Sequence, residues 1–263
     1  MSRRKKRRLK KPDLHKGVYI LPNLFTTLNM FSGFYAIISA INGLFVHAAL
    51  AIFAATFFDA ADGRVARATK STSRFGIEYD SLADLVSFGM APGIMMYLWA
   101  LEPWGRLGWL AGFLFMACGA LRLARFNTQV GQVSSEYFIG LPIPAAAAMC
   151  AATMLFFHRL GMATPNYPLL ILVLVYILSF LMVSTIKYFS FKKPELFREK
   201  SFNVLVAVLL VLVLIAAEAA VSLFILGLGY IASGPVNSLR LMRKAQLEEE
   251  AEQADNSPSE NAV

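Results

Sequence analysis

Charged residues are scarce in this sequence. Asp, Glu, Lys and Arg make up 16% of the 263 residues, whereas a soluble globular domain carries about a quarter. Apolar residues make up 57%, the mean hydropathy is +0.56, and apolar runs of about 17–25 residues recur along the chain. Because helices of this length cross the hydrocarbon core of a bilayer, the composition excludes an ordinary soluble domain and predicts an all-α, polytopic membrane helix bundle.

Cysteine is scarce as well. Cys118 and Cys150 lie inside apolar segments without Cys-x-x-Cys spacing, which excludes a disulfide framework and a thiolate metal site. No small-residue cleavage site follows the basic residues 1–20, so this segment is expected to stay attached in the cytoplasm, facing anionic lipid headgroups. The net charge of +8 does not indicate nucleic-acid binding, because the basic residues sit in connectors between apolar runs.

The apolar runs predict about eight transmembrane helices. They are expected at residues 21–41, 45–66, 77–99, 107–127, 139–157, 166–186, 201–217 and 219–235. Of the 25 Lys and Arg, 23 then lie on the N-terminal side of the membrane, and only Arg106 and Arg159 lie opposite. Because basic residues favour the cytoplasmic side, we expect both termini in the cytoplasm and the protein in the cell (inner) membrane.

Five parts are expected along the chain. They are the basic segment 1–20, a six-helix catalytic core at 21–188, a basic cytoplasmic connector at 189–200, a transmembrane hairpin at 201–235 and a cytoplasmic tail at 236–263. The tail is acidic and poor in large apolar side chains, so disorder is expected there. Only Glu218 separates the last two spans, and a hairpin is favoured because one helix of about 35 residues is too long for a single crossing.

Four carboxylates stand between the second and third spans, where charge is otherwise costly. Asp59 and Asp62 are three residues apart and Asp80 and Asp84 four apart, so a helical hairpin would bring both pairs together. Such like charges need compensation, and oxygen ligands favour Mg²⁺ or Mn²⁺, with Ca²⁺ as an alternative. Two ions bridged by carboxylates are typical of phosphoryl chemistry. Pairing of the carboxylates with nearby arginines is the structural alternative.

The spacing of this segment resembles the signature of the CDP-alcohol phosphatidyltransferases. Residues 59–84 read D-x₂-D-G-x₂-A-R-x₈-G-x₃-D-x₃-D and match that signature at all eight fixed positions. Members of the family move a phosphatidyl-type group from a CDP-linked lipid to an alcohol and release CMP. The resemblance implies that Asp59, Asp62 and Asp80 bind metal ions, that Asp84 touches metal and acts as the general base, and that the protein is a homodimer.

The resemblance also implies a binding site for CDP-diacylglycerol. The segment LPNLFTTLN at 21–29 is similar to the first helix of the family, and Gly76 lies one turn before Asp80, where a small residue permits close approach of a bulky ligand. The residues assigned to this site are Asn23, Thr26, Thr27, Gly63, Arg67, Ser73 and Gly76.

The acceptor alcohol depends on other segments. ACGALRLARFN at 117–127 and FIGLPIPAAAA at 138–148 resemble the bacterial and archaeal phosphatidylserine synthase subgroup, which implies L-serine. The candidate serine-binding residues are Arg122, Arg125, Asn127 and Lys187, with anchoring at the membrane surface as the alternative role of the basic ones. Glycerol 3-phosphate or inositol phosphate stays open, because basic residues lie nearby. None of the three histidines begins a His-x-Lys motif, which excludes the other type of phosphatidylserine synthase.

Two further function classes use carboxylates inside membranes. Intramembrane prenyltransferases carry two Asp motifs far apart in sequence, whereas the dense set here lies within residues 59–84. Cation transporters place such groups near the midplane, whereas these four are expected at the cytoplasmic end of their helices. Both classes are therefore weaker alternatives.

Overall fold

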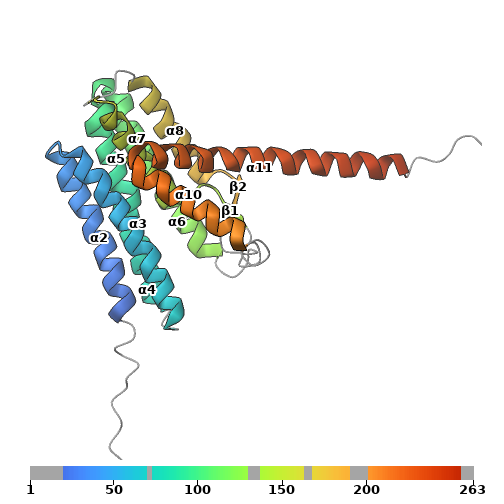
Figure 1. Cartoon of the computed structure of the whole chain (residues 1–263), viewed down its shortest axis with the longest axis horizontal. Helices are drawn as coiled ribbons and strands as arrows, with labels where there is room; N and C mark the ends of the chain where they lie inside the picture. The colour runs from blue at the N-terminus through green and yellow to red at the C-terminus, as the bar shows by residue number, and fades with distance from the viewer. Residues whose placement is uncertain (1–19, 70–72, 130–136, 163–167, 190–200, 256–263) are drawn as a thin grey trace, which may run out of the picture.

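The fold is a bundle of apolar helices (Figure 1). The computed structural model describes residues 20–69, 73–129, 137–162, 168–189 and 201–255. The main helices are α2 (Ile20–Ile41), α3 (Phe45–Ala68), α4 (Arg74–Asp84), α5 (Ala91–Met96), α6 (Arg106–Gln129), α7 (Ile143–Arg159), α8 (Pro168–Val183), α10 (Ser201–Ala217) and α11 (Ala219–Asp255). Within these residues five helical stretches are long and apolar enough to cross a membrane, and three more are apolar but shorter. The predicted all-α membrane class is confirmed.

The third span is a composite helical rod that begins earlier than expected. Ser73 caps α4, because its hydroxyl accepts a hydrogen bond of 3.0 Å from the backbone N–H of Gly76. The rod then continues through the π-helix η1 (Leu85–Met90), α5, the π-helix η2 (Tyr97–Leu101) and the 3₁₀ turn η3 (Glu102–Trp104). The two π-helical turns flank Pro92, which has no backbone N–H to donate.

The fifth span begins at Ile143, not at residue 139 as the sequence predicted. Residues 137–139 instead form β1 (Tyr137–Ile139), which pairs antiparallel with β2 (Lys187–Phe189). A proline fits in the first turn of a helix but not in its interior, so Pro142 and Pro144 place the helix start here. Correspondingly, α8 ends at Val183, so residues 184–186 of the predicted sixth span lie outside the helix and lead into β2.

The C-terminal helices meet at Glu218, where the sequence predicted a hairpin. Arg159 at the end of α7 donates hydrogen bonds of 3.1 and 2.7 Å to the Glu218 carboxylate, and this contact lowers the pKa of Glu218. Farther along, the rings of Phe156 and Phe224 stack with centroids 4.4 Å apart, and the Tyr188 hydroxyl donates to the Ile231 carbonyl. The first half of α11 therefore packs along α7.

The second half of α11 corrects one expectation. The helix continues without a break to Asp255 and extends past the bundle (Figure 1), so residues 236–255 are helical and not disordered. The stretch is rich in Ala, Glu, Gln and Leu, which are strong helix formers, and these residues extend the helix even without a large apolar face. The predictions for residues 1–19, 190–200 and 256–263 lie outside the described residues.

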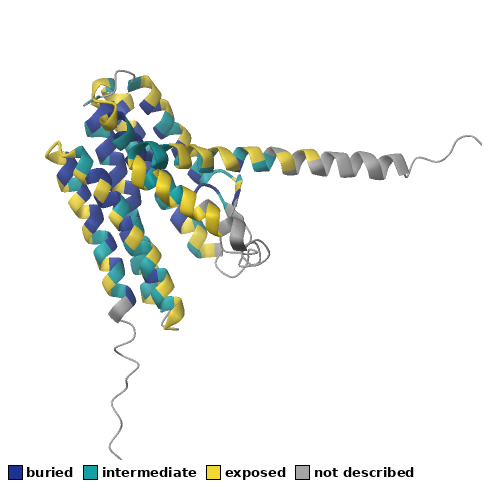
Figure 2. Cartoon of the chain, viewed as in Figure 1, coloured by how far each residue is buried: buried dark blue, intermediate teal, exposed yellow. Residues whose placement is uncertain are grey.

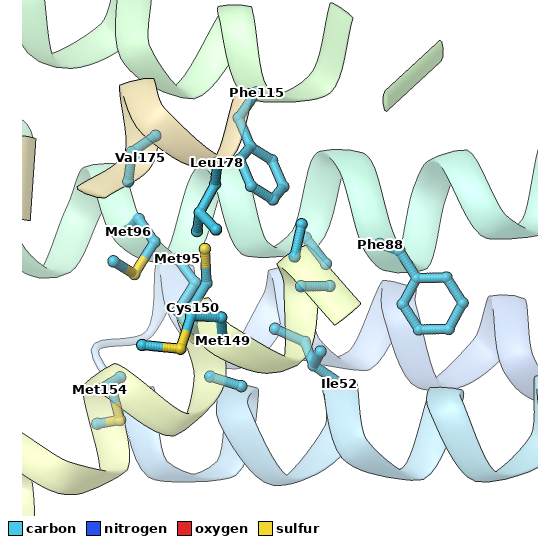
Figure 3. Packing of buried hydrophobic residues seen from close by; sticks show 14 of the residues in the cluster. Ile52, Phe88, Met95, Met96, Phe115, Met149, Cys150, Met154, Val175 and Leu178 are labelled. Atoms are coloured by element: carbon cyan, nitrogen blue, oxygen red, sulfur yellow. The ribbon is translucent and has the colours of Figure 1, made fainter. Parts of the chain in front are cut away.

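Buried apolar side chains from the helices between α2 and α8 and from β2 form one core, part of which is shown in Figure 3. It includes Ile52, Phe88, Met95, Phe115, Met149 and Leu178, none of them exposed by more than 1%. The two cysteines are free and buried, as predicted for small apolar residues. Exposed residues lie along the outer faces of the helices (Figure 2). Many of them are large apolar residues, as expected for surfaces in contact with lipid.

Substitution of Gly140 tests how tightly the turn between β1 and α7 is packed. Its φ is +78°, and an added Cβ would lie 2.4 Å from the Met182 carbonyl oxygen, whereas Gly43, with φ +73°, has nothing within 4 Å of an added Cβ. The left-handed conformation costs an alanine about 1–2 kcal/mol at either position. We expect Gly140→Ala to lower the melting temperature in detergent more than Gly43→Ala, because only Gly140 also meets a backbone atom. Equal melting temperatures would show that the turn relaxes around the new methyl group.

Candidate active site

Three of the four motif aspartates converge between the C-terminal half of α3 and the middle of α4. Asp59 and Asp62 lie on α3 and Asp80 on α4, and one carboxylate oxygen from each lies within 4.8 Å of the others. We call these three residues the carboxylate cluster. The i, i+3 spacing predicted that Asp59 and Asp62 share a face, and the helical hairpin turns that face toward Asp80. Asp84, one turn beyond Asp80, lies outside the group of three.

Asp84 is buried and held by a residue that the sequence analysis did not select. The side-chain N–H of Asn29, on α2, donates to Asp84 Oδ1 at 3.0 Å. The hydroxyl of Ser87 in turn donates to the Asn29 backbone carbonyl at 2.9 Å. Asn29 lies three residues after Thr26, so the helical period of the first span was a signal for it.

Thr26 supports the carboxylate cluster directly. Its hydroxyl lies 3.0 Å from Asp62 Oδ2, to which it donates, and 3.2 Å from the Pro22 carbonyl, and the residue is 3% exposed. The resemblance assigned Thr26 to cytidine or phosphate, and the structure adds a contact with a candidate metal ligand. Thr27 is exposed, and its hydroxyl lies 2.9 Å from that of Tyr79, a residue that the sequence analysis did not select.

A pocket of about 170 Å³ opens beside the carboxylate cluster. Its lining includes Asp62, Asp80 and every residue assigned to CDP-diacylglycerol except Thr27. Besides Asp62 and Asp80, the residues that line it are Pro22, Asn23, Thr26, Gly63, Ala66, Arg67, Ser73, Gly76 and Ile77. The small residues Gly63 and Gly76 leave room for a ligand, and the exposed guanidinium of Arg67 also lines the pocket.

The carboxylate cluster fits a divalent cation. Asp80 Oδ1 is buried and has no hydrogen-bond partner among the described residues. The cluster offers only oxygen ligands, which are the ligands that Mg²⁺, Mn²⁺ and Ca²⁺ prefer. A bound cation would offset the repulsion between three close carboxylates and give the buried oxygen a partner.

The two arginines predicted to bind serine differ in their surroundings. Arg125 donates from both terminal nitrogens to the last carbonyls of α8, at 2.7 Å to Val183 and 3.3 Å to Ser184. Arg122 is 9% exposed, and its Nε has no hydrogen-bond partner in the described part of the chain. Arg125 therefore stabilises the end of a helix, whereas the Arg122 guanidinium keeps hydrogen-bonding capacity.

Like the two arginines, the other two predicted serine-binding residues do not line the pocket. The Asn127 side chain donates to the Ser81 hydroxyl at 2.9 Å and so ties α6 to α4, one residue beyond Asp80. Lys187 is exposed and pairs with Ile139 in the two-stranded sheet. Neither side chain therefore places a free hydrogen-bond donor in the pocket.

The family follows from a match that spans most of the helical bundle. Residues 19–183 match the family model described as CDP-alcohol phosphatidyltransferase, and this range contains the cluster, the pocket and α2 to α8. The chain belongs to the CDP-alcohol phosphatidyltransferase family. The family predicted from the spacing of the aspartates is thereby confirmed.

Similar proteins within the family extend the comparison. The chain is 40% identical over 227 residues, 86% of its length, to a CDP-diacylglycerol–serine O-phosphatidyltransferase of Helicobacter pylori, of which it covers 94%. It is 38% identical over 173 residues to the protein of the same name in Bacillus subtilis, covering 66% of this chain and 92% of that one. An archaetidylserine synthase of Methanothermobacter thermautotrophicus is 38% identical over 170 residues, 64% of this chain and 69% of that protein.

Asp59→Asn and Asp80→Asn test whether the carboxylate cluster binds metal. In the wild type we expect Mn²⁺, added after chelation, to raise the melting temperature, because ligand at about 100 times its Kd stabilises a folded state by about 2.7 kcal/mol. Each variant should lose most of this rise. Glu78→Gln removes an exposed acid from the same helix as Asp80 and should keep it. A full rise in both cluster variants would contradict a metal site here.

Proposed function

We propose that this chain transfers the phosphatidyl group of CDP-diacylglycerol to the hydroxyl of L-serine and so forms phosphatidylserine and CMP. The observation that carries the proposal is a carboxylate cluster on the wall of a pocket lined by the residues that match the family's CDP positions. The serine acceptor is supported by 40% identity over 86% of the chain to a protein named for that reaction.

Asp84 is proposed as the general base for direct displacement. The serine hydroxyl attacks the phosphorus that carries the diacylglycerol, the bond from this phosphorus to the oxygen of CMP breaks, and Asp84 takes the hydroxyl proton. Asn29 supports this role, because its hydrogen bond fixes the orientation of the Asp84 carboxylate. Two Mg²⁺ or Mn²⁺ ions, with Ca²⁺ as an alternative, would offset charge on the pyrophosphate when bound to Asp59, Asp62, Asp80 and Asp84.

The nucleotide and its phosphates are proposed to occupy the pocket beside the cluster. Arg67 offers a planar guanidinium for a bidentate phosphate contact, and Gly63 and Gly76 permit close approach of the ligand. Asn23, Thr26 and Ser73 supply hydroxyl and amide groups for cytidine or phosphate, whereas Thr27, also assigned by the resemblance, does not line the pocket. No covalent intermediate on the enzyme is required, so trapping one on any side chain would contradict direct displacement.

The enzyme is proposed to act from the cell (inner) membrane, with both termini and the site at the cytoplasmic face. The distribution of basic residues supports this orientation, which suits a lipid substrate with a soluble nucleotide head. The proposed catalytic core is residues 21–188. The roles predicted from the sequence are also proposed for the segments 1–20, 189–200, 201–235 and 236–263, except that residues 236–255 are helical. A homodimer is proposed from the family resemblance.

An acceptor screen tests the proposed reaction. Purified protein with Mn²⁺, CDP-diacylglycerol and labelled L-serine should give lipid-soluble label and an equal amount of CMP. Glycerol 3-phosphate, inositol and inositol phosphate should give much less, because their acceptor groups lack the amino-acid head of serine. Preference for a phosphorylated alcohol would contradict the serine assignment, and absence of CMP with every alcohol would contradict the enzyme.

Asp84→Asn tests the base. We expect kcat to fall by about 100-fold or more, the usual contribution of general acid–base catalysis, while part of the affinity for CDP-diacylglycerol and metal is kept through Asp59, Asp62 and Asp80. Glu78→Gln on the same helix should keep the wild-type rate, because its side chain is exposed and outside the pocket. Near-normal turnover in Asp84→Asn would assign the base to another group.

A further inference from the structure

The proposed base lies where the third span packs against α2. Asp84 is the last residue of α4, and the π-helix η1 begins at the next residue, Leu85. η1 packs against α2, the helix that carries Asn29. Because π-helical turns are rare and are frequent at functional sites, the contacts of η1 bear on how the base is held.

Ser87 joins η1 to the residue of α2 that contacts the base. The Ser87 hydroxyl donates to the Asn29 backbone carbonyl at 2.9 Å, and the Asn29 side chain donates to Asp84 Oδ1 at 3.0 Å. Asn29 and Ser87 are both 0% exposed, so neither residue is open to bulk water. The third span therefore contacts Asn29 at two points, at its backbone through Ser87 and at its side chain through Asp84.

The hydrogen bond from Ser87 is not required to satisfy the backbone of α2. Asn29 lies inside this helix, where its carbonyl accepts the N–H of Gly33 in the regular i to i+4 pattern. A carbonyl oxygen has two lone pairs, so the Ser87 hydroxyl uses the second one. Loss of the hydroxyl would leave no orphaned backbone group, so what this bond contributes is the position of α2 against η1.

Gly33, one turn after Asn29, sets how closely the two helices approach. A Cβ added at Gly33 would lie 2.6 Å from Ser87 Cα and would also overlap the Ser87 side chain. Two carbon atoms cannot pack at that distance, so any side chain at this position forces the helices apart. The residue after Ser87, Phe88, is 0% exposed and lies in the apolar core (Figure 3), which limits how far η1 can move.

We propose that Ser87 and Gly33 are positioning residues for the transfer reaction, which set the place of Asp84 through Asn29. This inference rests on the proposed function, in which Asp84 takes the proton of the acceptor hydroxyl. Gly33 permits the close approach of α2, Ser87 fixes α2 at Asn29, and the Asn29 amide then orients the carboxylate. A misplacement of about 1 Å at the reacting groups costs about 100-fold in rate, so contacts outside the pocket control turnover.

Ser87→Ala tests the positioning contact without a change in the pocket, which Ser87 does not line. We expect kcat to fall about 5- to 10-fold, the factor that one buried hydrogen bond contributes, with the KM for CDP-diacylglycerol kept. Ser179→Ala is the matched control and should keep the wild-type kcat. Ser179 is also 0% exposed and also donates to a backbone carbonyl, that of Val175 at 2.7 Å, but it lies on α8. Equal kcat in the two variants would overturn the role of Ser87.

A double-mutant cycle separates positioning of the base from a general loss of packing. In Asn29→Ala the Ser87 hydroxyl keeps its backbone acceptor, but the link to Asp84 is gone. We therefore expect Ser87→Ala to lower kcat no further when it is added to Asn29→Ala or to Asp84→Asn. A purely structural role would instead make the losses multiply, and multiplied losses in both backgrounds would overturn the inference.

Gly33→Ala tests the close approach of the helices. We expect kcat of the folded protein to fall about 10- to 100-fold, because α2 must shift and carries Asn29 with it. Gly93→Ala is the matched control, since an added Cβ there would lie 2.9 Å from the Gly112 carbonyl oxygen, nine residues beyond Asp84 on the third span. Both variants should lower the melting temperature in detergent, but only Gly33→Ala should lower kcat. Equal kcat in the two folded variants would overturn the role of Gly33, and Ser87→Ala, which adds no atoms, tests the same link if Gly33→Ala does not fold.

The outcomes separate this inference from the proposed function. A wild-type kcat in Ser87→Ala, with an active wild type and an impaired Asp84→Asn, would overturn the positioning role alone. Near-normal turnover in Asp84→Asn would overturn the base and the positioning role together. A wild type that forms no product with any alcohol would refute the proposed function itself.

Discussion

The structure depends on the compensation of like charges inside an apolar helix bundle. Three carboxylates of α3 and α4 lie within 4.8 Å of one another, and a fourth is buried one turn away. Such a group is stable only if donors, cations or protons offset the repulsion. Thr26 and Asn29 supply two donors from α2, and the remaining deficit is what a divalent cation would fill.

The surrounding helices hold this group in place without adding charge to it. α2 packs beside the carboxylates through short polar side chains, while the core beyond them is built from Ile, Phe, Met and Leu. Arg125 stabilises the end of α8, and Arg159 ties the junction of α10 and α11 to α7 through Glu218. Arg125 and Arg159 thus hold helices together, whereas Arg122 has a buried Nε without a hydrogen-bond partner among the described residues.

Helical spacing was enough to predict the convergence of the aspartates, because residues three or four apart share a face. The hydrogen bond from Asn29 to Asp84 joins positions 55 apart, and only the packing of α2 against the third span creates it. Composition predicted disorder after residue 235, but helix propensity extended α11 to Asp255. The start of α7 was misplaced because apolar character also suits the strand that pairs with residues 187–189.

The carboxylate cluster is proposed to perform metal-dependent transfer from a CDP-linked lipid to serine. The most direct measurement is the release of CMP from CDP-diacylglycerol by purified protein that has first been stripped of metal. We expect CMP only when a divalent cation and L-serine are both present, with phosphatidylserine formed in equal amount. Equal release of CMP with serine in excess chelator would contradict it.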